Sequence, residues 1–503
     1  MLFFIIFACV LGYISWCYYS WQRLAHIPGP SFCGFTQFRQ LYWIAQGQPA
    51  AHYAKACARY GKLVRVAPNQ LITGDAEQWR KMGAIRSPYT RSNFFIAARF
   101  RAGEDSVLSM RDEKAHNELR TKLSPGYSGK EVPGVETIID KSIAEFVDLI
   151  RKYNSTSEAF RPMDLSEKIN FFTLDVISDL AFGQTFGNLK DDRDNPGIIR
   201  DTQKSVTLLA LFHELPYIYL FLEKTGVLRW LQTSLGDDFG FNRVFKTADD
   251  AVERRFGKAG EVMSKSLEDK NDMMGSFIRH GLSRRQIENE TVLQVLAGSD
   301  TTAGAIRSIL VPLMSNAQAQ RKLVEEIDKA NIKGSVVTDA EARDMPYLQA
   351  CIKEGMRWQP PAPTLLSRLV PPEGDTVNGF LVPGGTKIGW SGHAIHHDED
   401  LFGPDVDIFR PERWILCEDG GDCESSTRLT QMNRVSELQF SYGRFRCLGE
   451  IVAKIEINKI LVELFRRFEV NFCNPLKVFE MSFSADVFVQ AGMWVRVTER
   501  RRS

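Results

Sequence analysis

One segment near the N-terminus limits how this chain can fold more than any other. Residues 2–21 read LFFIIFACVLGYISWCYYSW and contain no charged side chain. Twenty residues in an α-helix extend about 30 Å, which matches the hydrocarbon core of a bilayer. Backbone groups in lipid must pair within their own segment, so a single segment of this kind has to be a helix. Four aromatic residues cluster at its end, as at a membrane interface (Trp16, Tyr18, Tyr19 and Trp21). We predict a transmembrane anchor over residues 1–22.

The charges that follow the anchor indicate its orientation. Residues 22–74 contain six basic side chains, and no Asp or Glu precedes Asp75. Positive charge usually stays on the cytosolic side, so we expect a lumenal N-terminus and a cytosolic body. The alternatives are a cleaved signal peptide or a buried core helix. A signal peptide would need a basic start and a small-residue cleavage site, and neither is evident.

The sequence after the anchor indicates one large, mainly helical domain. Ile27-Pro28-Gly29-Pro30 cannot continue a helix, so we expect a proline-containing hinge over residues 23–36 and a single domain over residues 37–503. Helical periodicity outweighs strand patterns, which predicts mainly α structure with a minor β-sheet. The clearest predicted helices are 137–152, 165–182, 287–303 and 317–330; the predicted strands are 63–66, 71–73, 387–390 and 493–497; residues 415–436 are predicted to be a surface loop.

Composition excludes several classes of function. Lys and Arg total 63 and Asp and Glu total 62, so the net charge is +1 and nothing favours a nucleic-acid partner. The nine cysteines include no Cys-x-x-Cys pair, which argues against a structural zinc site. No phosphate-binding loop and no Gly-x-Gly-x-x-Gly after a strand is evident, so the chain has no flavin or nicotinamide site of its own that we can identify.

A cysteine late in the chain has unusual neighbours. Residues 440–449 read FSYGRFRCLG, with Cys447 between basic residues and ahead of a helical stretch. Cations and a helix N-terminus both favour the thiolate, and Gly443 and Gly449 would let the backbone pass close to a flat ligand. A thiolate of this kind suits a haem iron. Taken alone, the pattern is more typical of an ordinary buried cysteine before a helix.

Four motifs together resemble the cytochrome P450 family. The loop resembles its F-x-x-G-x-x-x-C-x-G segment, with three other motifs upstream in the family's order: Ala297–Thr302 (AGSDTT), Glu354–Arg357 (EGMR) and Phe409–Trp414 (FRPERW). The resemblance implies haem b with Cys447 as the axial iron ligand. Smaller details of the sequence are similar to those of filamentous-fungal members near the pisatin demethylase group. The anchor and hinge resemble microsomal members, which implies a single-pass protein of the endoplasmic reticulum membrane in contact with membrane lipid.

The resemblance assigns catalytic roles to Asp300 and Thr301. Mid-helix Asp and Thr are unfavourable because their side chains compete for backbone hydrogen bonds. One interpretation is a helix break with either residue as an N-cap. The resemblance implies instead that Thr301 holds dioxygen and water, that Asp300 supplies protons, and that Ala297-Gly298 opens a groove over the haem. Pro312 should kink or end this helix.

Two further groups of residues take implied roles from the family. Glu354 and Arg357 are spaced i,i+3, which by itself indicates a surface ion pair; the resemblance adds Arg413 and implies a buried structural network behind the haem loop. Arg120 and Arg368 match the positions that bind the haem propionates. Two positions depart from the family: His116 replaces a Trp and is expected to donate one hydrogen bond, and Phe445 replaces an Arg, which leaves open whether Arg444 or Arg446 takes its place.

The implied function is a haem-thiolate monooxygenase. It would use O2, and electrons from NADPH through NADPH–cytochrome P450 reductase, to hydroxylate or oxidise a lipophilic small molecule. A basic surface around Lys122, Arg444, Arg446 and Lys454 is expected to meet the reductase. Fungal secondary metabolism, such as terpene or polyketide tailoring, is the expected setting. The alternatives are a monooxygenase that detoxifies plant compounds, an isomerase or dehydratase of the same family that does not use O2, and a membrane-tethered haem carrier.

Overall fold

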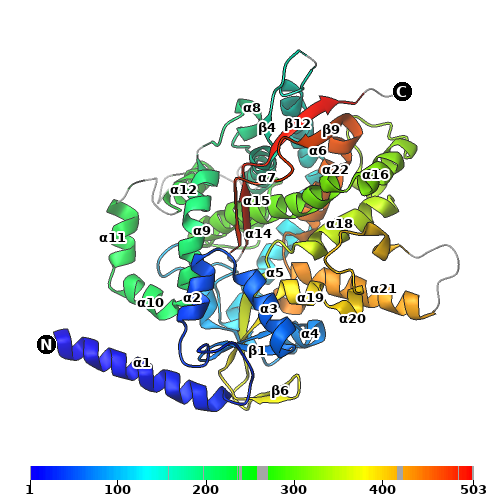
Figure 1. Ribbon diagram of the computed structural model, residues 1–503. Coiled ribbons are helices and arrows are strands. Elements are labelled where there is room, and N and C mark those ends of the chain that lie inside the picture. Colours follow the sequence, from blue (N-terminus) through cyan, green and yellow to red (C-terminus); the bar gives the residue numbers. More distant parts are fainter. Residues whose placement is uncertain are drawn as a thin grey trace.

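The computed structural model describes residues 2–156, 158–195, 197–234, 236, 241–257, 270–415, 423–484 and 487–500 (Figure 1). Helices make up most of it, and the strands form small sheets, so the predicted fold class is confirmed in this respect. Met1 of the predicted anchor and residues 501–503 of the predicted domain lie outside the described residues.

The largest sheet joins segments that are far apart in the sequence. Its strand order is β1-β2-β8-β5-β3, and β2 pairs in parallel with β8, which follows it by more than 300 residues. All four predicted strands are present within a residue or two of their expected limits. The strands are β1 (Leu63–Ala67), β2 (Gln70–Thr73), β3 (Thr90–Arg91), β4 (Met163–Asp164), β5 (Thr364–Leu369), β6 (Asp375–Val377), β7 (Phe380–Val382), β8 (Lys387–Ser391), β9 (Phe468–Phe472), β10 (Met481–Ser484), β11 (Phe488–Ala491) and β12 (Trp494–Glu499).

Helix ends follow local capping chemistry. Helix α7 matches its predicted limits because Asp164 accepts hydrogen bonds from two backbone N–H groups at its start and Gly183, with φ of 72°, ends it. The helices before the central one are α2 (Phe38–Ala45), α3 (Pro49–Tyr60), α4 (Ala76–Gly83), α5 (Glu113–Tyr127), α6 (Val135–Lys152), α7 (Leu165–Phe182), α8 (Asn188–Asp191), α9 (Ile198–Glu214), α10 (Pro216–Lys224), α11 (Val227–Ser234), α12 (Asn242–Phe256) and α14 (Met273–Arg279).

The central helix α15 (Arg284–Ser315) crosses the middle of the molecule (Figure 1). Two glycines let its neighbours approach: a Cβ on Gly298 would lie 2.7 Å from Ile177 of α7, and one on Gly355 of α18 would lie 2.6 Å from the Cα of Ile309. Pro312 does not end the helix, which stops three residues later at Ser315. The helices that follow are α16 (Ala317–Lys329), α17 (Asp339–Arg343), α18 (Pro346–Trp358), α19 (Gly392–His396), α20 (Glu399–Phe402), α21 (Cys423–Ser436) and α22 (Glu450–Arg467), with 3₁₀ turns η1 (Asn93–Ala98), η2 (Pro411–Trp414), η3 (Glu437–Phe440) and η4 (Gly443–Phe445).

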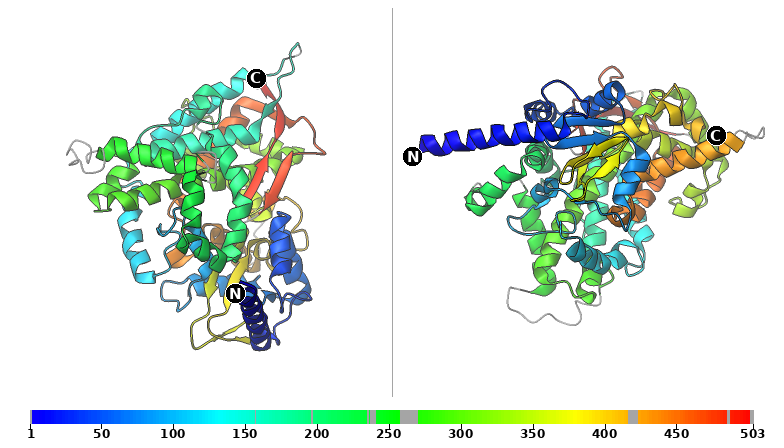
Figure 2. Two further views of the ribbon diagram at one scale, coloured as in Figure 1. Left: turned by 90° about the vertical axis from the view of Figure 1, so that its left-hand side faces the viewer. Right: turned by 90° about the horizontal axis from the view of Figure 1, so that it is seen from below.

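The N-terminal helix α1 (Leu2–Leu24) extends away from the body (Figures 1 and 2). Its C-terminal end is fastened by the buried side chain of Arg65, whose Nη2 donates to the Ser20 carbonyl (2.8 Å) and whose Nη1 donates to the Trp21 carbonyl (3.2 Å). The hinge joins the same anchorage, since Arg65 N donates to the Pro28 carbonyl at 2.8 Å. The helix and the hinge are therefore docked on the sheet.

A search of the described residues for membrane spans returns no single helix of sufficient length and hydropathy. The pair α9 and α10 passes that test together, bent by 102° at the break between them.

The predicted loop over residues 415–436 is partly wrong. Residues 416–422 lie outside the described residues, but Cys423–Ser436 is the helix α21. The signal that was overlooked is the three-residue spacing of Leu429, Met432 and Val435, which places them on one face against the core.

Candidate active site

Cys447 lies in a tight loop between the 3₁₀ turn η4 and helix α22. Its backbone N–H donates to the Phe440 carbonyl at 2.7 Å, which closes the loop. Gly443 has φ of 59°, and a Cβ there would overlap the Gly83 carbonyl of α4. Gly443 therefore serves a close backbone contact with the protein itself, where the sequence had indicated a contact with a flat ligand. A Cβ on Gly449 would contact only the Cys447 sulfur, at 3.9 Å.

The electrostatic surroundings of Cys447 differ from those predicted. Burial raises the pKa of the Cys447 thiol, while the N–H groups of Gly449 and Glu450 and the charge of Arg120 lower it. The two flanking arginines have other partners: Arg446 pairs with Glu450 at 2.6 Å, and Arg444 points to the Tyr89 carbonyl. Coordination to a metal would favour the thiolate further, because a metal deprotonates the thiol that it binds.

Three guanidinium groups surround the ring of Phe445: those of the buried Arg91 and Arg368 and that of the partly buried Arg444. Arg368 lies 3.9 Å, Arg91 4.6 Å and Arg444 4.9 Å from the ring centre. Arg91 and Arg368 are register partners in the β3–β5 pair. Phe445 thus occupies the centre of a cationic cluster, and Arg444, rather than Arg446, is the neighbour that turns into it.

Sequence reasoning missed Arg91. Its Nη2 lies 2.8 Å from Nε2 of His116, and Nδ1 of His116 lies 3.3 Å from Oδ1 of Asn117. Burial, followed by the charge of Arg91, lowers the pKa of His116 to about 3, so the ring is neutral. Both of its nitrogens have protein partners in this structure, and the expected hydrogen bond from His116 to the haem stays a prediction. The sequence shows only an isolated arginine in a segment where we had predicted no strand.

This cluster has more positive than negative charge. Within the described part of the chain its acidic neighbour is Glu113, which lies 3.7 Å from Nε of Arg444 and accepts from the backbone N–H of Arg91. Nε of Arg91 and Nε of Arg368 are buried and have no acceptor among the described residues. Unpaired buried donors are costly. The residues therefore fit a group that brings its own carboxylates, as the haem propionates do.

Arg120 lies at the edge of the same region. Its Nη2 donates to the Arg446 carbonyl at 2.6 Å, and its charge acts on Cys447. Arg120 therefore connects the cysteine loop to α5, within reach of both the thiol and the cationic cluster.

Asp300 and Thr301 lie inside the unbroken helix α15, so the helix-break interpretation is wrong. The Thr301 hydroxyl donates to the Ala297 carbonyl at 2.7 Å, one turn back. Ala297 and Thr301 keep accessible surface although most residues around them in the helix are buried. Gly298 faces Ile177 of α7, so it permits helix packing, and the predicted groove over the haem is supported here only by Ala297.

The carboxyl group of Asp300 titrates closer to neutrality than an ordinary Asp. Burial raises its pKa to about 6, with Arg307 opposing and Asp194 adding to the shift. A group with this pKa exchanges protons readily near physiological pH. The arrangement therefore places a proton source next to an orienting hydroxyl.

Glu354, Arg357 and Arg413 form one buried network. Arg357 donates to both carboxylate oxygens of Glu354, each at 2.9 Å, and Arg413 donates to Oε1 at 2.9 Å. Trp414 Nε1 also donates to Glu354, and Arg357 reaches the carbonyls of His396 and Val406. Glu354 and Arg357 are fully buried. The group ties α18 to the segment before the cysteine loop, which excludes the surface-pair interpretation.

The basic surface predicted near the loop is smaller than expected. Arg444 is turned inward, and Arg446 and Lys454 both pair with Glu450, at 2.6 and 2.7 Å. Lys122 is exposed. A partner at this face would meet a mixed charge pattern.

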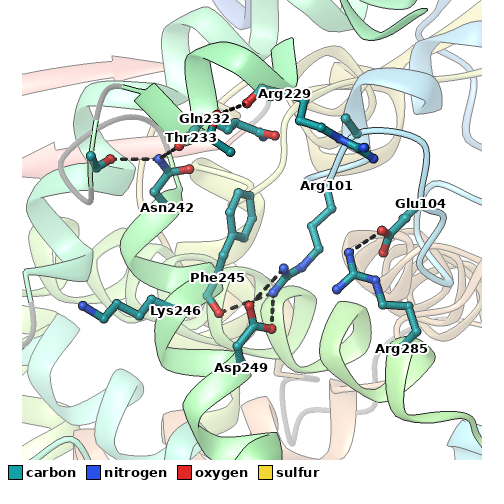
Figure 3. A pocket seen from close by; sticks show the side chains of 12 residues that line it. Arg101, Glu104, Arg229, Gln232, Thr233, Asn242, Phe245, Lys246, Asp249 and Arg285 are labelled. Carbon is teal, nitrogen blue, oxygen red and sulfur yellow. Dashed lines mark hydrogen bonds and ion pairs between the residues drawn. The ribbon is translucent and has the colours of Figure 1, made fainter. Parts of the chain in front are cut away.

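A separate cavity of about 470 Å³ lies between α11, α12 and the start of α15 (Figure 3). Arg101 pairs with Asp249 through two hydrogen bonds and Arg285 pairs with Glu104. These charged groups compensate one another, so we assign no ligand to the cavity.

The comparisons with known proteins agree with this geometry. The cytochrome P450 family model matches residues 28–490, and the chain therefore belongs to the cytochrome P450 family. It is 36% identical over 488 residues to cytochrome P450 monooxygenase ABA1 of Pyricularia oryzae, covering 94% of this chain and 93% of the relative. It is 33% identical over 491 residues to aba1 of Botryotinia fuckeliana (95% and 92%) and 27% identical over 468 residues to cicH of Emericella nidulans (90% and 90%). The chain is a cytochrome P450 monooxygenase with a haem-thiolate cofactor.

Proposed function

We propose that this enzyme oxidises a lipophilic small molecule in fungal secondary metabolism, with O2 and with electrons from NADPH delivered by NADPH–cytochrome P450 reductase. The observation that carries the proposal is the acid–alcohol pair of Asp300 and Thr301 in an unbroken α15. The fungal relatives that are named monooxygenases support the setting. Detoxification of plant compounds is the alternative within the same chemistry.

The residues divide the work as follows. Cys447 would ligate the iron, and Arg91, Arg120, Arg368 and Arg444 would hold the propionates, while the bound haem supplies the activation of dioxygen. The Asp300 carboxyl, with a pKa of about 6, would exchange a proton near neutral pH. The Thr301 hydroxyl, which donates to the Ala297 carbonyl in this structure, would orient that proton. The Glu354 network would support the cysteine loop by holding α18 against the segment that precedes the loop.

We further propose that α1 anchors the protein in the endoplasmic reticulum membrane, with the body cytosolic. Its described apolar side chains are largely exposed: Phe4 is 74% and Phe7 is 53% accessible. Exposed apolar surface of this extent marks contact with lipid or protein. Residues 1–22 would then be the anchor, 23–36 the hinge and 37–503 the catalytic domain.

Thr301→Ala in the reconstituted enzyme tests the proton relay. Substrate binding and iron reduction should persist, while product formed per NADPH should fall and peroxide should appear, because a positioned proton donor contributes about 10²–10⁴-fold to its step.

Incorporation of ¹⁸O from ¹⁸O2 into product identifies monooxygenation. Turnover of a peroxide without O2 or NADPH would favour the isomerase or dehydratase instead. Metabolite profiling of a deletion strain identifies the substrate.

A further inference from the structure

Arg307 is a buried cation two helical turns from Asp300. Both residues belong to α15, and Arg307 is 2% exposed. Seven residues make almost two full turns, so the two side chains share one face of the helix and start about 10 Å apart along its axis. Side chains on a helix lean toward its N-terminus, which directs Arg307 toward Asp300. A side chain as long as that of arginine could therefore approach the carboxyl group.

Helix α7 binds this cation instead. Nη1 of Arg307 donates to Oδ1 of Asn170 and, at 3.4 Å, to the Ser166 carbonyl. Asn170 and Ser166 lie one turn apart on α7, and both are buried. In the described part of the chain, Arg307 and Asp300 do not form an ion pair, and Nε of Arg307 has no acceptor. The cation is thus held by the neighbouring helix and stays out of contact with the acid on its own helix.

Few other charges act on these two groups. Among the described residues, Arg307 and Asp194 are the charged groups that act on Asp300, and Asp300 and Asp164 are those that act on Arg307. Asp194 lies before α9, and Asp164 is the N-cap of α7. Helices α7, α12, α18 and α22 and strand β11 also pack against α15 and add no charge to either group. The position of Arg307 therefore decides how much positive charge Asp300 experiences.

The distance between the two groups controls the protonation of Asp300. Burial alone favours the protonated acid, while a cation in direct contact favours the carboxylate and lowers its pKa by roughly 1–3. With Arg307 held on α7, the two effects leave the pKa of Asp300 at about 6. An acid that passes protons on must exist in both forms near the working pH.

We propose that Arg307 and Asn170 are positioning residues for the reaction: Asn170 holds the Arg307 cation at a distance at which Asp300 both takes up and releases protons. The proposal rests on the proposed function only in taking that proton to be the one that reaches Thr301. The two positioning residues should have opposite effects. Removing the cation favours protonated Asp300, whereas removing its restraint lets Arg307 pair with the acid and favours the carboxylate.

Infrared spectroscopy follows the proton on Asp300 without turnover. The sample is the ferric holoenzyme without NADPH, reductase or substrate, and the signal is the carboxylic-acid C=O band that is missing in Asp300→Asn. We expect this band to titrate with a midpoint of about pH 6. Arg307→Met should raise the midpoint and Asn170→Leu should lower it, each by about one pH unit.

Two further variants separate charge from packing. Arg307→Lys keeps a cation on α15 and should bring the midpoint back toward that of the unmodified enzyme. Thr173→Val removes a buried hydroxyl of α7 that bonds within its own helix, and it should leave the midpoint unchanged. Haem content reports on folding. If Arg307→Met loses haem, the comparison of Asn170→Leu with Thr173→Val decides.

The direction of the shifts decides between positioning and a merely structural contact. Shifts of the same sign in Arg307→Met and Asn170→Leu, or no shift in Asn170→Leu, overturn the proposal. A failure of the proposed function has a different signature: Asp300→Asn would then form as much product per NADPH as the unmodified enzyme does, whatever the midpoints of the other variants.

Discussion

The Arg91 guanidinium lies 2.8 Å from Nε2 of His116 and 4.6 Å from the centre of the Phe445 ring. A neutral histidine and an aromatic face thus position a buried cation whose Nε has no acceptor in the described chain. Phe445 stands where the family commonly has an arginine. Arg91, on strand β3, places a cation in the same region and is held there by His116.

Arg91→Leu should weaken haem retention. One charge-assisted contact to a propionate contributes roughly 10- to 100-fold, so transfer of haem to an acceptor protein should be faster by about that factor. The reduction potential should become more negative, because a positive charge near the iron is removed. Arg151→Leu, at a surface arginine that pairs with Glu499 at 3.1 Å, is the matched control and should change neither quantity.

Cys447→Ala should abolish the thiolate-type Soret band of the reduced carbon monoxide complex. The reason is that the loop places one sulfur between Phe440 and the start of α22. Cys473→Ala, at an exposed cysteine, should leave the band intact. A variant that lacks Cys447 but keeps the band would refute the ligand assignment.

Asp300→Asn should make the protein more stable at pH 7 but not at pH 4. Burial raises the folded pKa of Asp300 from 3.8 to about 6, so the folded state binds more protons than the unfolded state between these values. Stability is then lost as pH rises through this window, by at most about 3 kcal/mol. Chemical denaturation of both proteins at pH 4 and pH 7 measures the difference; an equal gain at both pH values would contradict the shift.

Glu354→Ala should be strongly destabilising. It leaves two buried cations, Arg357 and Arg413, without their shared carboxylate, and breaking a buried pair costs about 3–5 kcal/mol. Lys322→Ala breaks the half-exposed pair with Glu412 and should cost less than about 1 kcal/mol. Denaturation midpoints and haem content report both effects.

Deleting residues 1–22 should release most of the protein from the membrane fraction. The exposed apolar surface of α1 is removed, while exposed residues of α10, such as Tyr217 and Phe221, remain and allow weak peripheral attachment. Fractionation with an alkaline carbonate wash measures this. Resistance of the truncated protein to the wash would show that another segment is integral to the membrane.

Periodicity and capping predicted the regular elements well. Helix α7 begins at the Asp164 cap and ends at Gly183, both visible in the sequence. The motifs also predicted that Glu354, Arg357 and Arg413 form a network and that Cys447 lies in a loop before a helix. Long-range pairing was beyond local patterns: the position of Arg91 beside Arg368 depends on the β3–β5 register, and the inward turn of Arg444 depends on the Tyr89 carbonyl. Gly298 was misassigned because its role is set by Ile177, over a hundred residues away.

Arg65 has a consequence beyond holding the hinge. Its guanidinium contacts carbonyls at the end of α1, in the hinge and at Pro68 after β1, so one side chain ties the end of α1 to the sheet. If α1 lies in a bilayer, as we propose, this contact would oppose swivelling of the body on its tether. The protein itself would then set the tilt of the body and its height above the lipid. Encounters with a membrane-bound electron donor would then occur by lateral diffusion of two bodies whose faces are already oriented.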